Sequence, residues 1–190
     1  FRHIKVFVTY ANDSKHHSRQ VLSLCNCLDR NGFSCCVDVY SRHEDSEEQQ
    51  KASRDWCGRK FKEADFILVC ISPQYLREIE MADTSVSAAA SADSSGLLHA
   101  AHIYRLMQEE FQRTGKCSRF VPLYFEGSSS GQGPSWLTRQ LVYYHWPRQY
   151  KDLLWMLTKP EERIKQRPTQ RNHSTASMNG HRSPLPSSVH

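Results

Sequence analysis

Apolar residues lie along the chain in short runs, separated by longer stretches of mixed polarity. Two of these runs, Lys5–Tyr10 and Asp65–Ser72, contain Val, Ile, Phe and Leu without polar alternation. This pattern is typical of strands that are buried on both faces of a parallel sheet. Similar runs predict strands at 4–10, 33–40, 65–72, 119–125 and 141–146. Because Pro122 lies inside the fourth run, we expect that strand to lie near an edge or at a bulge.

The stretches between these runs have the spacing of amphipathic helices. The first helix is predicted from about Ser14 to Arg30, with Asp13 or Ser14 as its N-cap and Asn31-Gly32 at its end. The second ends near Lys62 and is heavily charged. Its predicted apolar anchors are Ala52, Trp56 and Phe61.

Further helices are predicted at 97–113 and 149–157, and the Ser/Ala-rich run at 81–96 is predicted to be a mobile loop. Strands that alternate with helices indicate an α/β fold. With right-handed crossovers, the expected architecture is a flavodoxin-like, five-stranded parallel sheet of order 2-1-3-4-5, flanked by helices.

Composition divides the chain into a predicted domain at 2–158 and a tail at 159–190. The tail is polar with almost nothing to bury, so we expect it to be disordered. Residues 1–158 carry 19 basic and 18 acidic side chains, whereas residues 159–190 carry 6 and 2. The basic excess lies in the tail, so we do not expect the domain to bind nucleic acid, which requires a basic face. The sequence opens close to the first predicted strand and does not begin with Met, so we expect it to be cut from a longer protein with further regions upstream.

The seven cysteines lie mostly in apolar runs, where a free thiol packs as a small hydrophobe. No C-x-x-C pair is present, and the histidine pairs His16-His17 and His99/His102 have no third ligand nearby. The sequence therefore predicts no metal site and no cofactor. No apolar run reaches 18 residues, so we expect no membrane insertion and a reducing, cytoplasmic location.

A doubly wound sheet binds ligands at the carboxyl ends of its strands. The turn after the first strand, 11–14, has no Gly-rich phosphate loop. A phospho-acceptor domain would need Asp and Lys where this chain has Ile71-Ser72 and His145-Trp146. The run Gly127–Gly131 matches G-x-S-x-G but leads into a Gly/Pro linker instead of a helix. We therefore predict no catalytic residue.

Charged helix surfaces are the remaining candidates for a functional site. They are Arg54, Arg59 and Lys62 on the second helix, and Arg105, Gln108 and Glu109 on the outer side of the helix at 97–113. Such surfaces can dock an oppositely patterned partner, and the ordinary alternative is a solvated helix face. Two tryptophans beside the last strand, Trp136 and Trp146, are predicted to be structural.

Several segments together resemble the SEFIR domain family: KVFVTYAND at 5–13, FILVCISPQY at 66–75, HIYRLMQEEF at 102–111, RFVPLYF at 119–125, PSWL at 134–137 and VYYHWP at 142–147. The helix segment and the ending resemble adaptor members more than receptor members. The resemblance implies a TIR-like fold and a cytoplasmic adaptor. It also implies SEFIR–SEFIR contacts with interleukin-17 receptors, self-association, recruitment of TRAF-type ubiquitin ligases and NF-κB activation.

SEFIR domains are similar to Toll/interleukin-1 receptor (TIR) domains, some of which hydrolyse NAD with a Glu that follows the third strand. Alignment on Ser72 and Tyr75 places Thr84 at the position of that Glu. The resemblance therefore implies an interaction module and not an enzyme. TIR-like NAD hydrolysis, and RNA binding by the same surface, are the alternatives. The Ser/Ala insert at 84–95 departs from the adaptor pattern, so its role stays open.

Overall fold

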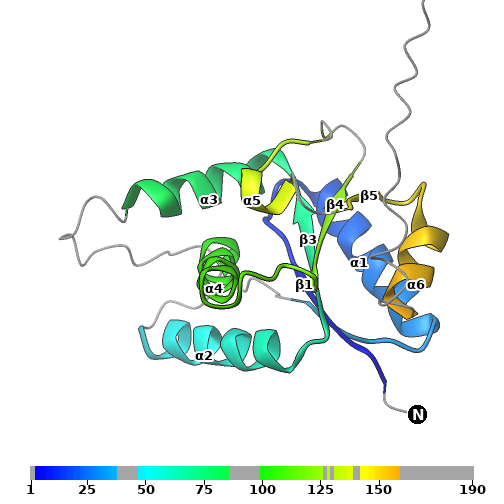
Figure 1. Cartoon of the computed structure of the whole chain (residues 1–190), viewed down its shortest axis with the longest axis horizontal. Coiled ribbons are helices and arrows are strands. Elements are labelled where there is room, and N and C mark those ends of the chain that lie inside the picture. Colours follow the sequence, from blue (N-terminus) through cyan, green and yellow to red (C-terminus); the bar gives the residue numbers. More distant parts are fainter. Residues whose placement is uncertain are drawn as a thin grey trace, which may run out of the picture.

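The protein forms a five-stranded parallel sheet with helices on both faces (Figure 1). The computed structural model describes residues 3–37, 47–85, 99–125, 128, 131–138 and 142–158. The strands are β1 (Lys5–Thr9), β2 (Ser34–Val37), β3 (Phe66–Ile71), β4 (Phe120–Tyr124) and β5 (Tyr144–His145). Their order is β2-β1-β3-β4-β5. The α/β fold and the strand order predicted from the sequence are confirmed.

The helices are α1 (Lys15–Arg30), α2 (Glu47–Glu63), α3 (Pro73–Ser85), α4 (His99–Thr114), α5 (Ser135–Thr138) and α6 (Tyr150–Thr158). Figure 1 shows α1 and α6 on one side of the sheet and α2, α3, α4 and α5 on the other. The buried apolar residues divide in the same way into two clusters, one on each face. The sheet is therefore the middle layer of three.

Strand β3 lies at the centre of this arrangement and is buried along its whole length. Phe66, Leu68 and Cys70 pack in the cluster with α1 and α6. The residues between them pack in the cluster on the opposite face. This alternation is what the period of two in a strand requires, and it confirms the prediction of a strand buried on both faces.

The ends of α1 follow from local hydrogen bonding. Ser14 is the N-cap, and its Oγ accepts a hydrogen bond from the backbone N–H of His17 at 3.1 Å. At the other end Asn31 is the C-cap, and Gly32 follows with φ of +84°, which glycine adopts without strain. Both predicted helix ends are confirmed. Of the two candidate N-caps, Asp13 and Ser14, it is Ser14 that caps the helix.

Helix α3 was not predicted, and it makes the loop prediction wrong for residues 81–85. Pro73 does end the strand, but it also occupies the first position of a helix, where a missing N–H is no loss. The side chain of Ser72 accepts a hydrogen bond from the N–H of Tyr75 at 3.2 Å and so caps this helix. The rest of the predicted loop and the tail at 159–190 lie outside the described residues.

Smaller differences concern the anchors of α2 and the last strand. Ala52 is exposed, so its prediction as an anchor is wrong, whereas Phe61 is buried and Trp56 is half-buried. The anchor that the sequence reading missed is Cys57, which is 1% exposed.

The last strand is shorter than the predicted range of 141–146. Strand β5 has only the two residues Tyr144 and His145, and the short helix α5 precedes it.

Pro122 lies in the interior of β4, where it stands opposite Val69 of β3. The edge strand β5 pairs only with Leu123 and Tyr124 of β4. Pro122 therefore lies just before the short edge strand begins. This agrees with the expectation that the proline would lie near an edge of the sheet.

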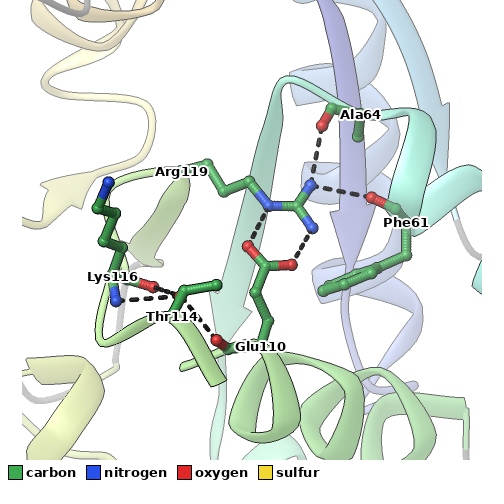
Figure 2. Close-up of polar contacts among 6 residues, drawn as sticks. All are labelled: Phe61, Ala64, Glu110, Thr114, Lys116 and Arg119. Carbon is green, nitrogen blue, oxygen red and sulfur yellow. Dashed lines mark hydrogen bonds and ion pairs between the residues drawn. The ribbon is translucent and has the colours of Figure 1, made fainter. Parts of the chain in front are cut away.

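Arg119 ties the C-terminal end of α2 to α4 and to the start of β4 (Figure 2). Its Nε donates to Glu110 Oε1 at 2.7 Å, and its Nη2 pairs with Glu110 Oε2. Its Nη1 donates to the carbonyl oxygens of Phe61 at 2.9 Å and Ala64 at 2.8 Å. These carbonyls have no partner within the helix, so Arg119 satisfies them and places a positive charge at the negative end of the helix dipole. We call this set of contacts the Arg119 clamp.

Apolar contacts shield the clamp from water. The guanidinium carbon of Arg119 lies 4.5 Å from the centre of the Phe61 ring and 5.7 Å from that of Phe120. The side chains of Arg119 and Glu110 are 21% and 20% exposed. Partial burial makes the ion pair stronger than a surface pair, and it raises the cost of leaving either member alone.

We expect Arg119→Ala to lower the free energy of unfolding by ~2–4 kcal/mol, because Glu110 and two carbonyls lose their partner. Urea denaturation followed by circular dichroism measures this loss. The control is Lys60→Ala, which breaks the exposed pair between Lys60 and Glu63 and should cost ~0–1 kcal/mol. Equal losses in the two variants would contradict the clamp.

Candidate docking surfaces

One stripe of α2 faces solvent, and it contains two of the predicted partner-binding residues. The exposed positions between 51 and 63 are Lys51, Ala52, Asp55, Arg59, Lys62 and Glu63. They recur at intervals of three and four, so they form a single face of the helix. We call it the α2 stripe.

Arg59 and Lys62 are two basic side chains of the α2 stripe, in the last two turns of the helix. Glu63 already pairs with Lys60 at 3.2 Å and with Lys5 at 3.8 Å. The hydrogen bond from Lys60 is the main cause that lowers the pKa of Glu63. Neither Arg59 nor Lys62 forms an ion pair with a residue that the structure describes, so both cations are available to a partner.

Arg54 belongs to the same helix but not to the same face. It is half-buried, and it lies five residues before Arg59, which places the two side chains more than a quarter-turn apart. The predicted trio of Arg54, Arg59 and Lys62 therefore divides into an exposed pair and one residue at the flank.

The second predicted surface, on α4, is largely covered. Gln108 is half-buried, and its Nε2 donates to the hydroxyl of Tyr104 at 3.1 Å. Arg105 is also half-buried, and only Glu109 of the three predicted residues is exposed. The structure thus places Arg105 and Gln108 at the margin of the core. Of the three residues predicted on the outer side of this helix, only Glu109 is exposed there.

Trp136, on α5, packs against the same part of α4. Its Nε1 donates to the hydroxyl of Tyr104 at 3.3 Å, so Trp136 and Gln108 share one acceptor. Its ring is stacked on Phe111 with the centroids 5.2 Å apart and meets the edge of Phe120 at 6.2 Å. Trp136 is half-buried and joins the short helix α5 to α4.

Trp146 directly follows β5 and is 7% exposed. Its backbone N–H donates to the carbonyl of Tyr124 at 2.9 Å, which extends the pairing of β5 with β4. Its side chain belongs to the core cluster on the face of α1 and α6. The two tryptophans therefore pack on opposite faces of the sheet.

At the carboxyl ends of the strands, the polar groups mostly make contacts within the fold. Asp13 Oδ2 accepts from the N–H of Gln74 at 3.5 Å, at the start of α3. Ser128 Oγ donates to the carbonyl of Ile71 at 3.3 Å, and the hydroxyl of Tyr124 donates to the carbonyl of Gln132 at 2.7 Å. These contacts hold the connecting segments onto the sheet.

A buried carboxylate was missed by the sequence reading. Glu78 on α3 is 6% exposed, and its Oε1 accepts a hydrogen bond from Gln74 Nε2 at 3.1 Å. Tyr75 beside it is fully buried, and burial raises the pKa of its hydroxyl far above the usual range. The interval of four between Gln74 and Glu78 on a helix was the available signal, but it depended on predicting α3.

Some of the other predicted positions lie partly outside the residues that the structure describes. Thr84 lies in α3, but its side chain is outside the described set, as are the side chain of His99 and most of the run Gly127–Gly131. Among the residues that the structure describes, no group of three His, Cys, Asp or Glu side chains could hold a metal ion. None of the helices in this part of the chain is long and apolar enough to cross a membrane.

Comparison with known protein families matches residues 4–157 to the SEFIR domain. The chain belongs to the SEFIR domain family. The match spans every strand and helix described above except the last residue of α6. The resemblance noted in the sequence is therefore confirmed at the level of the family.

Among solved structures, this SEFIR domain is similar to the one described as "Crystal Structure of iL-17 receptor B SEFIR domain". The TM-score is 0.51 at 14% sequence identity, and the match covers 83% of this chain and 96% of the other. At this identity the similarity establishes the fold, which agrees with the sheet order of the domain.

We expect Trp146→Ala to lower the free energy of unfolding by ~3–5 kcal/mol, because it opens a cavity in the core. Trp136→Ala should cost less, ~1–3 kcal/mol, because Trp136 is half-buried and loses one stacked ring and one hydrogen bond. Thermal and urea unfolding measure both. The control is Trp155→Ala, a residue 38% exposed. Normal stability combined with lost partner binding would instead identify either tryptophan as an interface anchor.

Proposed function

We propose that this SEFIR domain is a signalling interaction module that docks onto other SEFIR domains through the α2 stripe. The observation that carries the proposal is the pair Arg59 and Lys62. Both are exposed, and neither has an ion-pair partner among the residues described by the structure. Exposed and unpaired charges steer association and set the register of a partner.

The charge pattern of the α2 stripe suits a partner of similar fold. Asp55 lies one turn before Arg59, and Lys62 lies one turn after it. A second copy of this helix can lie antiparallel in a register that sets Asp55 of each copy opposite Arg59 of the other. This is the self-complementary arrangement of a two-fold interface, and it supports both homotypic pairing and self-association.

The Arg119 clamp supports the same proposal from the inner side of the helix. A docking helix needs a fixed orientation, because disorder in the free surface lowers the affinity. Arg119 fixes the end of α2 that carries Arg59 and Lys62 through the carbonyls of Phe61 and Ala64. The α2 stripe is therefore held in place before a partner arrives.

The finer part of the proposal concerns the pathway. We assign the domain to a cytoplasmic adaptor that joins interleukin-17 receptors to TRAF-type ubiquitin ligases through other parts of its parent protein, upstream of NF-κB. What supports this is the family membership together with the adaptor-like segments at 102–111, 134–137 and 142–147.

We expect Arg59→Glu combined with Lys62→Glu to weaken binding to interleukin-17 receptor SEFIR domains at least about tenfold, ~1.4 kcal/mol. Isothermal titration calorimetry of the purified domains measures the affinity. The binding of the unmodified domain should fall with added salt, because exposed charges are screened. Circular dichroism should show an unchanged fold.

The matched control is Lys15→Glu combined with Arg19→Glu. These residues are exposed on α1, in the opposite layer, and the pair changes the net charge by the same amount. It should leave the affinity nearly unchanged. If both double variants bind equally, the α2 stripe is not the docking surface. If neither binds less well than the unmodified domain while Glu109→Lys does, the surface lies on α4.

We expect the purified domain to release no nicotinamide from NAD. Enzymes of the related TIR family carry a catalytic Glu at the position where this chain has Thr84. Chromatography of an overnight incubation measures the product, with an active TIR hydrolase as the positive control. Nicotinamide release that is lost in Glu78→Gln would contradict the assignment as a module without chemistry.

A further inference from the structure

Two cysteines from adjacent elements face the same part of the core. Cys25 lies on the buried side of α1 and is 7% exposed. Cys35 lies on β2 and is half-buried against the same cluster. Its neighbour Cys36 packs in the cluster on the other face of the sheet, as the alternation of a strand requires.

Backbone geometry brings β2 under the last turns of α1. The N–H of Phe33 donates to the carbonyl of Leu28 at 3.1 Å, and the N–H of Cys35 donates to Asp29 Oδ1 at 3.2 Å. Asp29 lies one turn after Cys25 on the helix. Cys35 is therefore held beside the turn of α1 that carries Cys25, and both thiols lie in or against the same core cluster.

Each thiol affects the ionisation of the other. The interaction with Cys35 is the largest cause that lowers the pKa of Cys25, and it outweighs the opposing effect of burial. The interaction with Cys25, together with burial, raises the pKa of Cys35. Cys70, fully buried on β3, also has its pKa raised by burial. A lowered pKa favours the thiolate of Cys25, and the thiolate is the reactive form of a cysteine.

We propose that Cys25 and Cys35 are an oxidisable dithiol, which hydrogen peroxide converts to an intramolecular disulfide that links α1 to β2. The thiolate sulfur of Cys25 attacks one peroxide oxygen, the O–O bond breaks, and the hydroxide that leaves takes a proton from solvent to become water. Cys25 is then a sulfenic acid.

In the second step the sulfur of Cys35 attacks the sulfur of Cys25. The S–O bond breaks, and the leaving hydroxide takes the Cys35 proton to become a second water. The two thiols lose two electrons and two protons, and the peroxide is reduced to two waters. A thiol reductant reverses the change by disulfide exchange.

The place of the pair in the fold gives the modification a structural consequence. β2 is the edge strand of the sheet beside β1, and it holds to α1 through the contacts of Phe33 and Cys35. A disulfide adds a covalent link to these hydrogen bonds, so the oxidised domain should open less readily at this edge. The inference does not depend on the docking function.

The test is oxidation of the purified protein with a small excess of hydrogen peroxide, followed by alkylation under denaturing conditions and mass spectrometry. We expect the number of free thiols to fall from the seven in the sequence by two, and dithiothreitol to restore it. Trypsin without reduction should release peptides 20–30 and 31–42 as one linked species. Each of these peptides contains two cysteines, so variants must identify the linked pair.

Cys35→Ser and Cys25→Ser should each abolish the link. Cys27→Ser and Cys36→Ser, the matched controls on the same two peptides, should retain it. Circular dichroism checks that each variant folds, and if Cys25→Ser does not, Cys35→Ser decides, since that side chain is half-buried. Seven unmodified thiols, a link that persists in Cys35→Ser, oxidation of Cys25 without a link, or linkage only between chains would each overturn the proposal.

Discussion

Burial of β3 on both faces is the constraint on which the rest of this SEFIR domain depends. None of its side chains can face water, so apolar helices must cover both sides of the sheet. α1 and α6 cover one side, and the helices from α2 to α5 cover the other. The separation of the helices into two layers, and with it the position of the α2 stripe far from α1, follows from this strand.

The Arg119 clamp fixes the orientation of α2 on the sheet, which apolar burial alone does not. Apolar contacts alone allow a helix to slide or rotate on a sheet, and α2 has few of them, chiefly Cys57 and Phe61. Hydrogen bonds from Arg119 to Phe61, Ala64 and Glu110 require one orientation. The clamp and the burial of Cys57 and Phe61 together hold α2 with the proposed docking surface toward solvent.

The same reasoning separates the two candidate surfaces. A polar or charged residue on a helix docks a partner only if nothing in its own fold has already taken its hydrogen-bonding groups. Gln108 donates to Tyr104, and Trp136 shares that acceptor from α5. Arg59 and Lys62 form no ion pair with the described residues and remain exposed. The density of charge in the sequence did not distinguish these two surfaces. What distinguishes them is that α5 packs against the α4 surface.

The sequence by itself determined the first four strands, the strand order, the ends of α1 and the family. Buried runs, capping residues and family-like segments can be read along the chain, and right-handed crossovers limit the strand order. It did not reveal α3, since Ser72-Pro73 reads equally as the stop of a strand and the start of a helix. It also gave no sign of the Arg119 clamp or of the position of Cys35 beside the turn of α1 that carries Cys25, because the members of each set come from different elements. Only the packing of those elements decided such contacts, and it decided in the same way which charges of α2 and α4 reach solvent.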